Sequence, residues 1–191
     1  SDVSGNHPEL VSQLRALAEA HKAEMTRGFE KNRGRPFTSG YAASTTLPAR
    51  DGTEHGEIKR SVRSPNNSFF TNWTRTEDSI TWLTEVIEPG TYEVTVFYTC
   101  QAGNEGAQIR LTSRLASTKL ATVTKVFDPP FYDKSIERMA ESHYWMKEFM
   151  PLSLGIISLQ SGEQTLKLEA KKIPGRAAIE VHSIRMVRRN S

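Results

Sequence analysis

Aromatic side chains beside polar loops are the residues of this chain whose types could do recognition chemistry. A sugar ring stacks on the flat face of an aromatic side chain, while amide, carboxylate and guanidinium groups bind its hydroxyls. The candidates of this kind are Trp73, Phe131, Tyr132, Tyr144 and Trp145. Arg75, two residues after Trp73, adds a cationic donor that suits a sulfate group. Packing in the core or within a loop is the competing interpretation for each aromatic residue.

A second group of polar residues crowds one loop. Asp51, Glu54, His55 and Glu57 fall within seven positions. Carboxylate oxygens are hard ligands that Ca²⁺ prefers, so Asp51, Glu54 and Glu57 form a candidate calcium site. The spacing matches no EF-hand loop, and a solvated acidic loop is the alternative.

Catalytic chemistry has little support in the sequence. The single cysteine, Cys100, ends an apolar stretch, which is typical of a buried structural thiol, and one cysteine excludes an internal disulfide. No nucleophile–base pair, paired-carboxylate signature or metal-ligand cluster stands out. We therefore expect no catalytic residue and no enzyme activity in this chain.

Charge and hydropathy exclude two further classes of partner. The 25 basic and 22 acidic residues give a net charge of +3, with the two signs intermixed along the chain. A nucleic-acid-binding surface needs a more segregated basic face, so we expect no nucleic-acid partner. No run of 18 apolar residues occurs, which excludes a helical membrane span. The first residues also lack the basic and apolar regions of a signal peptide.

The periodicity of apolar residues predicts two regions. Leu10, Leu14 and Leu17 recur at helical spacing, and Pro8 suits a first helical position, so a helix is expected over 8–31. The segment 37–68 is rich in Ser, Thr, Gly, Pro and Asn and is expected to be irregular, with at most one short strand. Strands are then expected at 69–73, 79–87, 91–100, 107–115, 119–127, 144–149, 152–159, 165–170 and 179–187.

Alternation within these strands indicates the fold class. Ile80, Trp82 and Val86 share one face of their strand, and a Pro-Gly turn leads into a second alternating strand. Trp82 is therefore expected in the core. The pattern predicts a mainly β protein, an antiparallel jelly-roll β-sandwich over 37–191, preceded by one N-terminal α-helix within 1–36.

Several motifs resemble known families. Trp82-Leu-Thr-Glu85 followed by Gly90-Thr-Tyr92-Glu-Val94 is similar to the galactose-binding-like β-sandwich group, which includes many carbohydrate-binding modules. The C-terminal extension of bacterial type I sulfatases, of the N-acetylgalactosamine-6-sulfatase-like kind, resembles the chain more widely. The stretches that carry this second resemblance are Leu47–Gly52, His55-Gly56, Asn72-Trp73-Thr74, Tyr98-Thr99-Cys100 and the His7-Pro8-Glu9 start of the helix.

The sulfatase resemblance implies a non-catalytic part of a larger enzyme. Sulfatases need a Cys or Ser in Cys/Ser-x-Pro-x-Arg, and here Thr46 occupies that place before Pro48 and Arg50. Threonine cannot be oxidised to the required aldehyde, so the match is expected to be coincidental. Residues 1–36 would then be the end of a preceding catalytic domain or a linker, and the parent enzyme would be exported, to the periplasm or beyond the cell.

Two functions remain as expectations. The first is a non-catalytic accessory domain that binds carbohydrate, with a sulfated glycan as a possible ligand. The second is a structural domain that packs on an upstream sulfatase catalytic domain or mediates oligomerisation, with no ligand of its own. An amphipathic helix that precedes a sandwich motivates the second.

Overall fold

The computed structural model describes residues 4–28, 36–62, 68–132 and 146–189. The chain divides into two compact units, Ser1–Arg35 and Pro36–Ser191. Within the described residues, no helix has the length and apolar character needed to cross a membrane.

The first unit contains a short 3₁₀ turn, η1 (Ser4–Asn6), and one α-helix, α1 (Pro8–Met25). Pro8 occupies the first helical turn, where a missing backbone N–H costs nothing, and Glu9 there complements the helix dipole. The helix ends earlier than the expected residue 31. Thr26 caps it with N–H bonds to the Lys22 and Glu24 carbonyls, and Gly28 follows with φ of +80°. No residue of α1 is buried.

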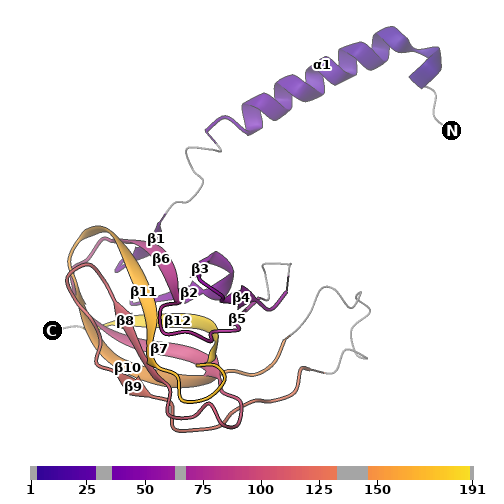
Figure 1. Ribbon diagram of the computed structural model, residues 1–191. Helices are drawn as coiled ribbons and strands as arrows, with labels where there is room; N and C mark the ends of the chain where they lie inside the picture. Colours follow the sequence, from indigo (N-terminus) through magenta and orange to yellow (C-terminus); the bar gives the residue numbers. More distant parts are fainter. Residues whose placement is uncertain (1–3, 29–35, 63–67, 133–145, 190–191) are drawn as a thin grey trace. The chain divides into compact units, whose positions relative to one another are not determined.

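The second unit is a sandwich of two sheets (Figure 1). The first sheet, sheet A, has the order β1-β6-β11-β8-β9, with β3 also paired to β6. Its strand β1 runs parallel to β6, and the other pairs are antiparallel. The bounds of its strands are β1 (Phe37–Ser39), β3 (Thr53–His55), β6 (Ser79–Val86), β8 (Gln108–Thr112), β9 (Ala121–Thr122) and β11 (Gly162–Lys172).

The second sheet, sheet B, has the order β10-β7-β12-β5-β4, with β2 also paired to β12. All of its pairs are antiparallel. A 3₁₀ turn, η2 (Ala49–Asp51), connects β2 to β3 of the other sheet. The bounds of its strands are β2 (Ser44–Pro48), β4 (Lys59–Arg60), β5 (Phe70–Thr71), β7 (Gly90–Thr99), β10 (Met150–Leu159) and β12 (Glu180–Arg188).

One hydrophobic core lies between the sheets, and alternation along the strands builds it. In β7, Tyr92, Val94, Val96 and Tyr98 are buried, while the residues between them are less so. In β6, Trp82 is buried and its indole N–H donates to the Pro48 carbonyl at 2.9 Å. The mainly β sandwich preceded by one helix, predicted from the sequence, is confirmed.

The expected strand bounds are wrong in several places. The segment 37–68 contains four short strands, β1 to β4, where at most one was expected. Only Phe70–Thr71 of the expected strand 69–73 is extended in the sheet, because Asn72 adopts a positive φ of 59°. Only Ala121–Thr122 of 119–127 pairs as a strand, at the edge of sheet A. Of the expected strand 144–149, residues 144 and 145 lie outside the described residues, and 146–149 form no strand, since β10 begins at Met150.

Candidate functional site

The aromatic candidates divide into three groups. Trp73 is 1% exposed and belongs to the core, so neither face of its ring is open for a sugar to stack on. Tyr132 is 53% exposed, and its N–H donates to the Met146 carbonyl at 2.8 Å. Tyr144 and Trp145 lie outside the described residues. In the described part of the chain, Tyr132 and the neighbouring Phe131, which is 39% exposed, are therefore the aromatic candidates that a ligand can reach.

Arg75 lies on the same loop as Trp73 but points to solvent. Its guanidinium lies 3.9 Å from the Glu57 carboxylate, and both side chains are more than half exposed. An exposed pair of this kind is weak and leaves the arginine available to a ligand.

The acidic loop does not gather its carboxylates around one point. Asp51 pairs with Arg50 at 3.0 Å, Glu54 with Arg60 at 3.3 Å, and Glu57 with Arg75. Across the described residues, no three His, Cys, Asp or Glu side chains converge in a way that could hold a metal ion. Asp51, Glu54 and Glu57, the residues expected to hold calcium together, are thus each turned toward a different arginine.

A cavity of about 220 Å³, lined mostly by residues with polar side chains, lies where three loops meet at one end of sheet B. We call it the loop pocket, and its polar lining comes from Thr71, Asn72, Thr99, Gln101, Arg176 and Glu180. The loops that follow β5 and β7 and the loop that precedes β12 supply these residues. The pairing of Val181 with both Phe70 and Tyr98 brings the three loops to the same edge.

Glu180 is the most constrained polar group of the loop pocket. Its two carboxylate oxygens accept hydrogen bonds from the Thr71 hydroxyl at 3.0 Å and the Thr99 hydroxyl at 2.6 Å. The ammonium of Lys147 pairs with the same carboxylate and, at 3.0 Å, with Asp128. The charge of Glu180 is thereby held in place before any ligand arrives.

Lys147 itself is buried between aromatic rings and carboxylates. The residue is 7% exposed, and its ammonium lies 5.3 Å from the centre of the Phe69 ring and 5.6 Å from that of Phe131. A cation over an aromatic face is attracted by the ring quadrupole. Lys147 therefore links the aromatic segment at Phe131 to Glu180 in the wall of the loop pocket.

Backbone ties fix the remaining walls of the loop pocket. The side-chain carbonyl of Asn104 accepts N–H bonds from Arg176 at 2.9 Å and Ala177 at 3.3 Å. Asn72 donates its side-chain amide to the Glu57 carbonyl at 2.6 Å. By contrast, the Gln101 and Arg176 side chains are exposed at the rim, with no hydrogen bond or ion pair of their own among the described residues. Fixed walls with available donors at the rim are the arrangement of a binding site for a polar ligand.

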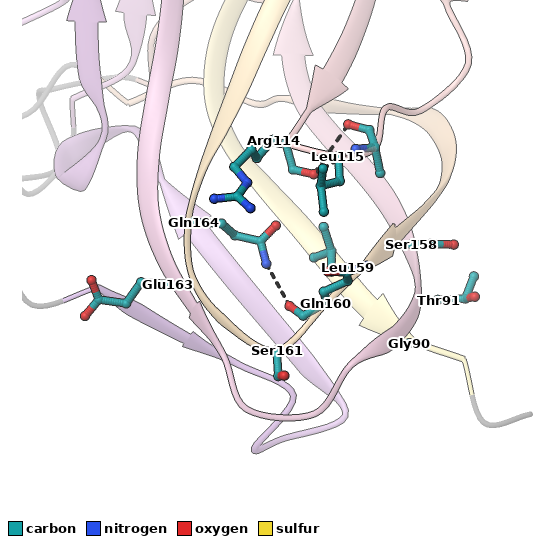
Figure 2. A pocket seen from close by; sticks show the side chains of 12 residues that line it. Gly90, Thr91, Arg114, Leu115, Ser158, Leu159, Gln160, Ser161, Glu163 and Gln164 are labelled. Carbon is teal, nitrogen blue, oxygen red and sulfur yellow. Dashed lines mark hydrogen bonds between the residues drawn. The ribbon is translucent and has the colours of Figure 1, made fainter.

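A second cavity, of about 420 Å³, lies at the opposite end of β7. We call it the turn pocket. Figure 2 shows that Arg114, Leu115 and Gln164 point toward its interior, while Glu163 points away from them. The Gln164 amide donates to the Gln160 carbonyl at 2.8 Å. The turn pocket has hydroxyl and amide groups but no aromatic ring in its lining.

Reasoning from the sequence missed the residues of both pockets. Glu180, Arg176 and Gln101 lie in or beside turns that are far apart in the chain, and only the register of sheet B brings them together. The signal that was available is the Gly–Asn turn at 103–104, a polar connection between two well-patterned strands.

Comparisons with known proteins establish the fold. No family model matches the sequence, and no curated protein sequence is significantly similar to it. Among solved structures, a family 35 carbohydrate-binding module from Clostridium thermocellum matches with a TM-score of 0.53 and 11% identity, over 76% of this chain and 98% of that one. A Podospora anserina GH26-CBM35 β-(1,4)-mannanase matches with a TM-score of 0.53 and 12% identity, over 78% of this chain and 28% of that one.

The same fold also occurs in a different setting. The mosquito-larvicidal Cry4Aa toxin from Bacillus thuringiensis matches with a TM-score of 0.55 and 11% identity, over 78% of this chain and 24% of that chain. At such identities the likeness is one of architecture. This chain thus spans nearly the whole of the Clostridium module but about a quarter of the mannanase and of the toxin.

Proposed function

We propose that this chain is a non-catalytic accessory domain that binds carbohydrate in the loop pocket. The observation that carries the proposal is the convergence of three loops on a small cavity, whose polar side chains are held by hydrogen bonds within the protein. Glu180 is an acceptor for sugar hydroxyls, and Gln101 and Arg176 are donors at the rim. The sandwich fold shared with carbohydrate-binding modules supports the same function by analogy.

The size of the loop pocket restricts its ligand. A cavity of about 220 Å³ is smaller than the roughly 300–1,000 Å³ that is usual for drug-sized ligands. One sugar unit, at the end of a glycan or at a branch, is the group that we expect it to hold. Arg176, with Arg75 on the adjoining loop, would pair with a sulfate substituent on that unit through charge-assisted hydrogen bonds.

The parentage of the domain is a proposal as well. The motifs Leu47–Gly52 and Asn72-Trp73-Thr74 resemble the C-terminal extension of sulfatases, so we place the chain in an exported sulfatase-like enzyme. In that enzyme the domain would keep the catalytic domain close to its polymeric substrate. The catalytic chemistry would belong to the upstream domain.

A glycan array tests the proposed function. The chain would be screened against neutral and sulfated glycans at 0.1 and 0.5 M salt, beside the double variant Gln101→Ala/Arg176→Ala. The control is Arg15→Ala, which removes an exposed arginine of α1. We expect one glycan class to bind with salt resistance, with a loss of about tenfold or more in the double variant only. An array without any bound glycan would contradict the proposal.

A structural role is the second candidate, and one observation favours it. Leu10, Leu14 and Leu17 of α1 are all more than half exposed, although they lie at helical spacing on one side. A short helix is marginal without a packed face, so this stripe would pack on a catalytic domain or on a second subunit. Light scattering tests whether the stripe packs on a second subunit, by comparing the molar mass of the chain with that of the variant Leu14→Gln/Leu17→Gln. Equal masses for the two would exclude self-association through α1.

A further inference from the structure

A concentration of positive charge lies on the outer face of sheet A. Arg110 of β8 and Lys167 and Lys171 of β11 surround the single carboxylate of Glu169 at 3.0, 3.1 and 3.2 Å. We call these four residues the basic cluster. Three cations share one anion, so the cluster keeps an excess of two positive charges at the protein surface.

The charge state of Glu169 is fixed by these neighbours. Burial alone raises the pKa of its carboxyl, but hydrogen bonds from Lys167, Arg110 and Lys171 outweigh burial and lower the pKa to about 2. Glu169 thus holds the three cations together near one point of the sheet. The Lys167 and Lys171 side chains remain about two-fifths exposed, so both can still reach a ligand.

The basic cluster adjoins the turn pocket. A shallow cavity of about 430 Å³ is lined by Arg110 and Glu169 and also by Ser113, Leu115 and Ala116. The last three residues line the turn pocket as well. Both cavities therefore adjoin the loop that follows β8, and we call the pair of cavities the basic groove.

A tight turn holds Arg114 in the loop that both cavities adjoin. The N–H of Ser113 donates to the Ala116 carbonyl at 2.7 Å, and the N–H of Ala116 donates to the Ser113 hydroxyl at 3.2 Å. Thr118 closes the loop against Leu111 through a backbone bond at 2.9 Å. Arg114 projects from this turn beside Gln164 (Figure 2), and it has no ion pair within the described part of the chain.

The lining of the groove favours one class of polyanion. Hydroxyl and amide side chains, such as Ser161, Gln160 and Gln164, can exchange hydrogen bonds with sugar hydroxyls. Single-stranded nucleic acid needs aromatic rings on which bases stack, and no aromatic residue lines either cavity. We infer that the basic groove is a second binding site, which takes an acidic polysaccharide, with anionic groups of successive sugars on Arg114 and on the basic cluster.

This inference goes beyond the loop pocket and does not depend on it. The groove and the loop pocket lie at opposite ends of β7, since Thr91 lines the first and Thr99 the second. Each site can be removed without touching the other. A domain with both sites would hold a glycan terminus in one place and an anionic stretch of chain in another.

The test measures binding of dextran sulfate and of unsulfated dextran of equal length to the folded chain. The variant is Arg114→Gln/Lys171→Gln, in which Glu169 keeps two of its three cationic partners. The matched control is Arg15→Gln/Lys22→Gln, which removes one exposed arginine and one exposed lysine from α1. Circular dichroism and thermal melting of both variants verify the fold.

We expect the chain to bind dextran sulfate but not dextran. The groove variant should bind at least about tenfold more weakly at 0.1 M salt, and its affinity should depend less steeply on salt because fewer counterions are released. The control should lose no more than about twofold, since its charges lie elsewhere. Equal losses of affinity in the two variants would show that net charge alone accounts for the binding, and would overturn the inference. Equal binding of an oligothymidylate of the same charge would overturn the assignment to polysaccharide.

The two proposals fail in different ways. One result would be that dextran sulfate binds through Arg114 and Lys171 while Gln101→Ala/Arg176→Ala has no effect on the glycan array. That result would support the basic groove as a binding site and contradict the proposed site in the loop pocket. If polyanion binding is lost only in the loop-pocket variant, the groove is overturned and the proposed function remains.

Discussion

The ammonium of Lys147 pairs with the Glu180 carboxylate at a point where the lysine is almost completely buried. Asp128 and two threonine hydroxyls join this network, so the ammonium and the carboxylate each have polar partners in addition to one another. A buried pair adds little net stability compared with an apolar replacement, but the loss of one partner leaves an uncompensated charge. The pair is therefore a sensitive point of the fold, and it borders the loop pocket.

Lys147→Gln should lower the free energy of unfolding by about 3 kcal/mol, because Glu180 would be left without its cation. Guanidinium denaturation of the chain measures the effect. The control is Lys22→Gln, which breaks the exposed pair with Glu19 at 3.9 Å and should change stability by less than about 0.5 kcal/mol. In a double-mutant cycle with Glu180→Gln, additive losses would show that the two groups are not coupled.

Gly175→Ala should disturb the loop pocket. A Cβ atom at this position would meet the Gly103 carbonyl oxygen and the side-chain carbonyl of Asn104, and neither can retreat without breaking the Asn104 bonds to the 176–177 backbone. We expect a loss of roughly 1–3 kcal/mol in stability and weaker glycan binding. Gly5→Ala, where an added Cβ meets nothing within 4 Å, is the control. A Gly175→Ala variant with unchanged melting temperature and binding would show that this contact can relax freely.

The sequence predicts those parts of the molecule in which one local pattern decides the structure. Trp82 is correctly placed in the core because it alternates with Ile80 and Val86 in a long strand. Trp73 misled the prediction, since Asn72 takes a positive φ after a two-residue strand and no alternation extends to the tryptophan. Local sequence gives no signal for such a change of direction.

The candidate sites lie beyond local prediction for a related reason. Glu180 meets Thr71 and Thr99 because β12 pairs with both β5 and β7, over separations of 109 and 81 residues. The register of those pairs depends on the whole core. The acidic loop shows the converse, because Asp51 and Glu57 are close in sequence yet turn to different arginines.

Cys100 should resist alkylation in the folded chain. Burial, followed by the nearby charges of Glu105 and Asp128, raises the pKa of its thiol to about 11, so very little thiolate forms at neutral pH. Iodoacetamide at pH 7.5, followed by mass spectrometry, should label less than a few per cent of the native chain. Labelling should become complete in 6 M guanidinium. Rapid labelling without denaturant would mean that the thiol is accessible in solution.

His182 should make the chain less stable in mild acid. Burial beneath Phe149, with ring centres 4.7 Å apart, lowers the pKa of the imidazole below its usual value of 6.5. The unfolded chain therefore binds a proton before the folded chain does, and stability falls as the pH drops below about 6.5. His182→Phe should remove this dependence between pH 7 and 5, as measured by melting temperature. A profile that is identical to that of the wild type would assign the transition to another group.

Glu169 should govern stability in a lower and separate pH range. Its folded-state pKa of about 2 lies below the ordinary value of 4.5, so its contribution is complete above pH 4.5 and is lost as the pH falls toward 2. Glu169→Gln should be destabilised at pH 6, where Arg110, Lys167 and Lys171 lose their shared anion. The difference from the wild type should shrink steadily between pH 4.5 and 2, as measured by urea denaturation at each pH. Glu163→Gln, on the same strand but outside the basic cluster, should show no such trend, and a constant difference for Glu169→Gln across the range would contradict the ion-pair account of the basic cluster.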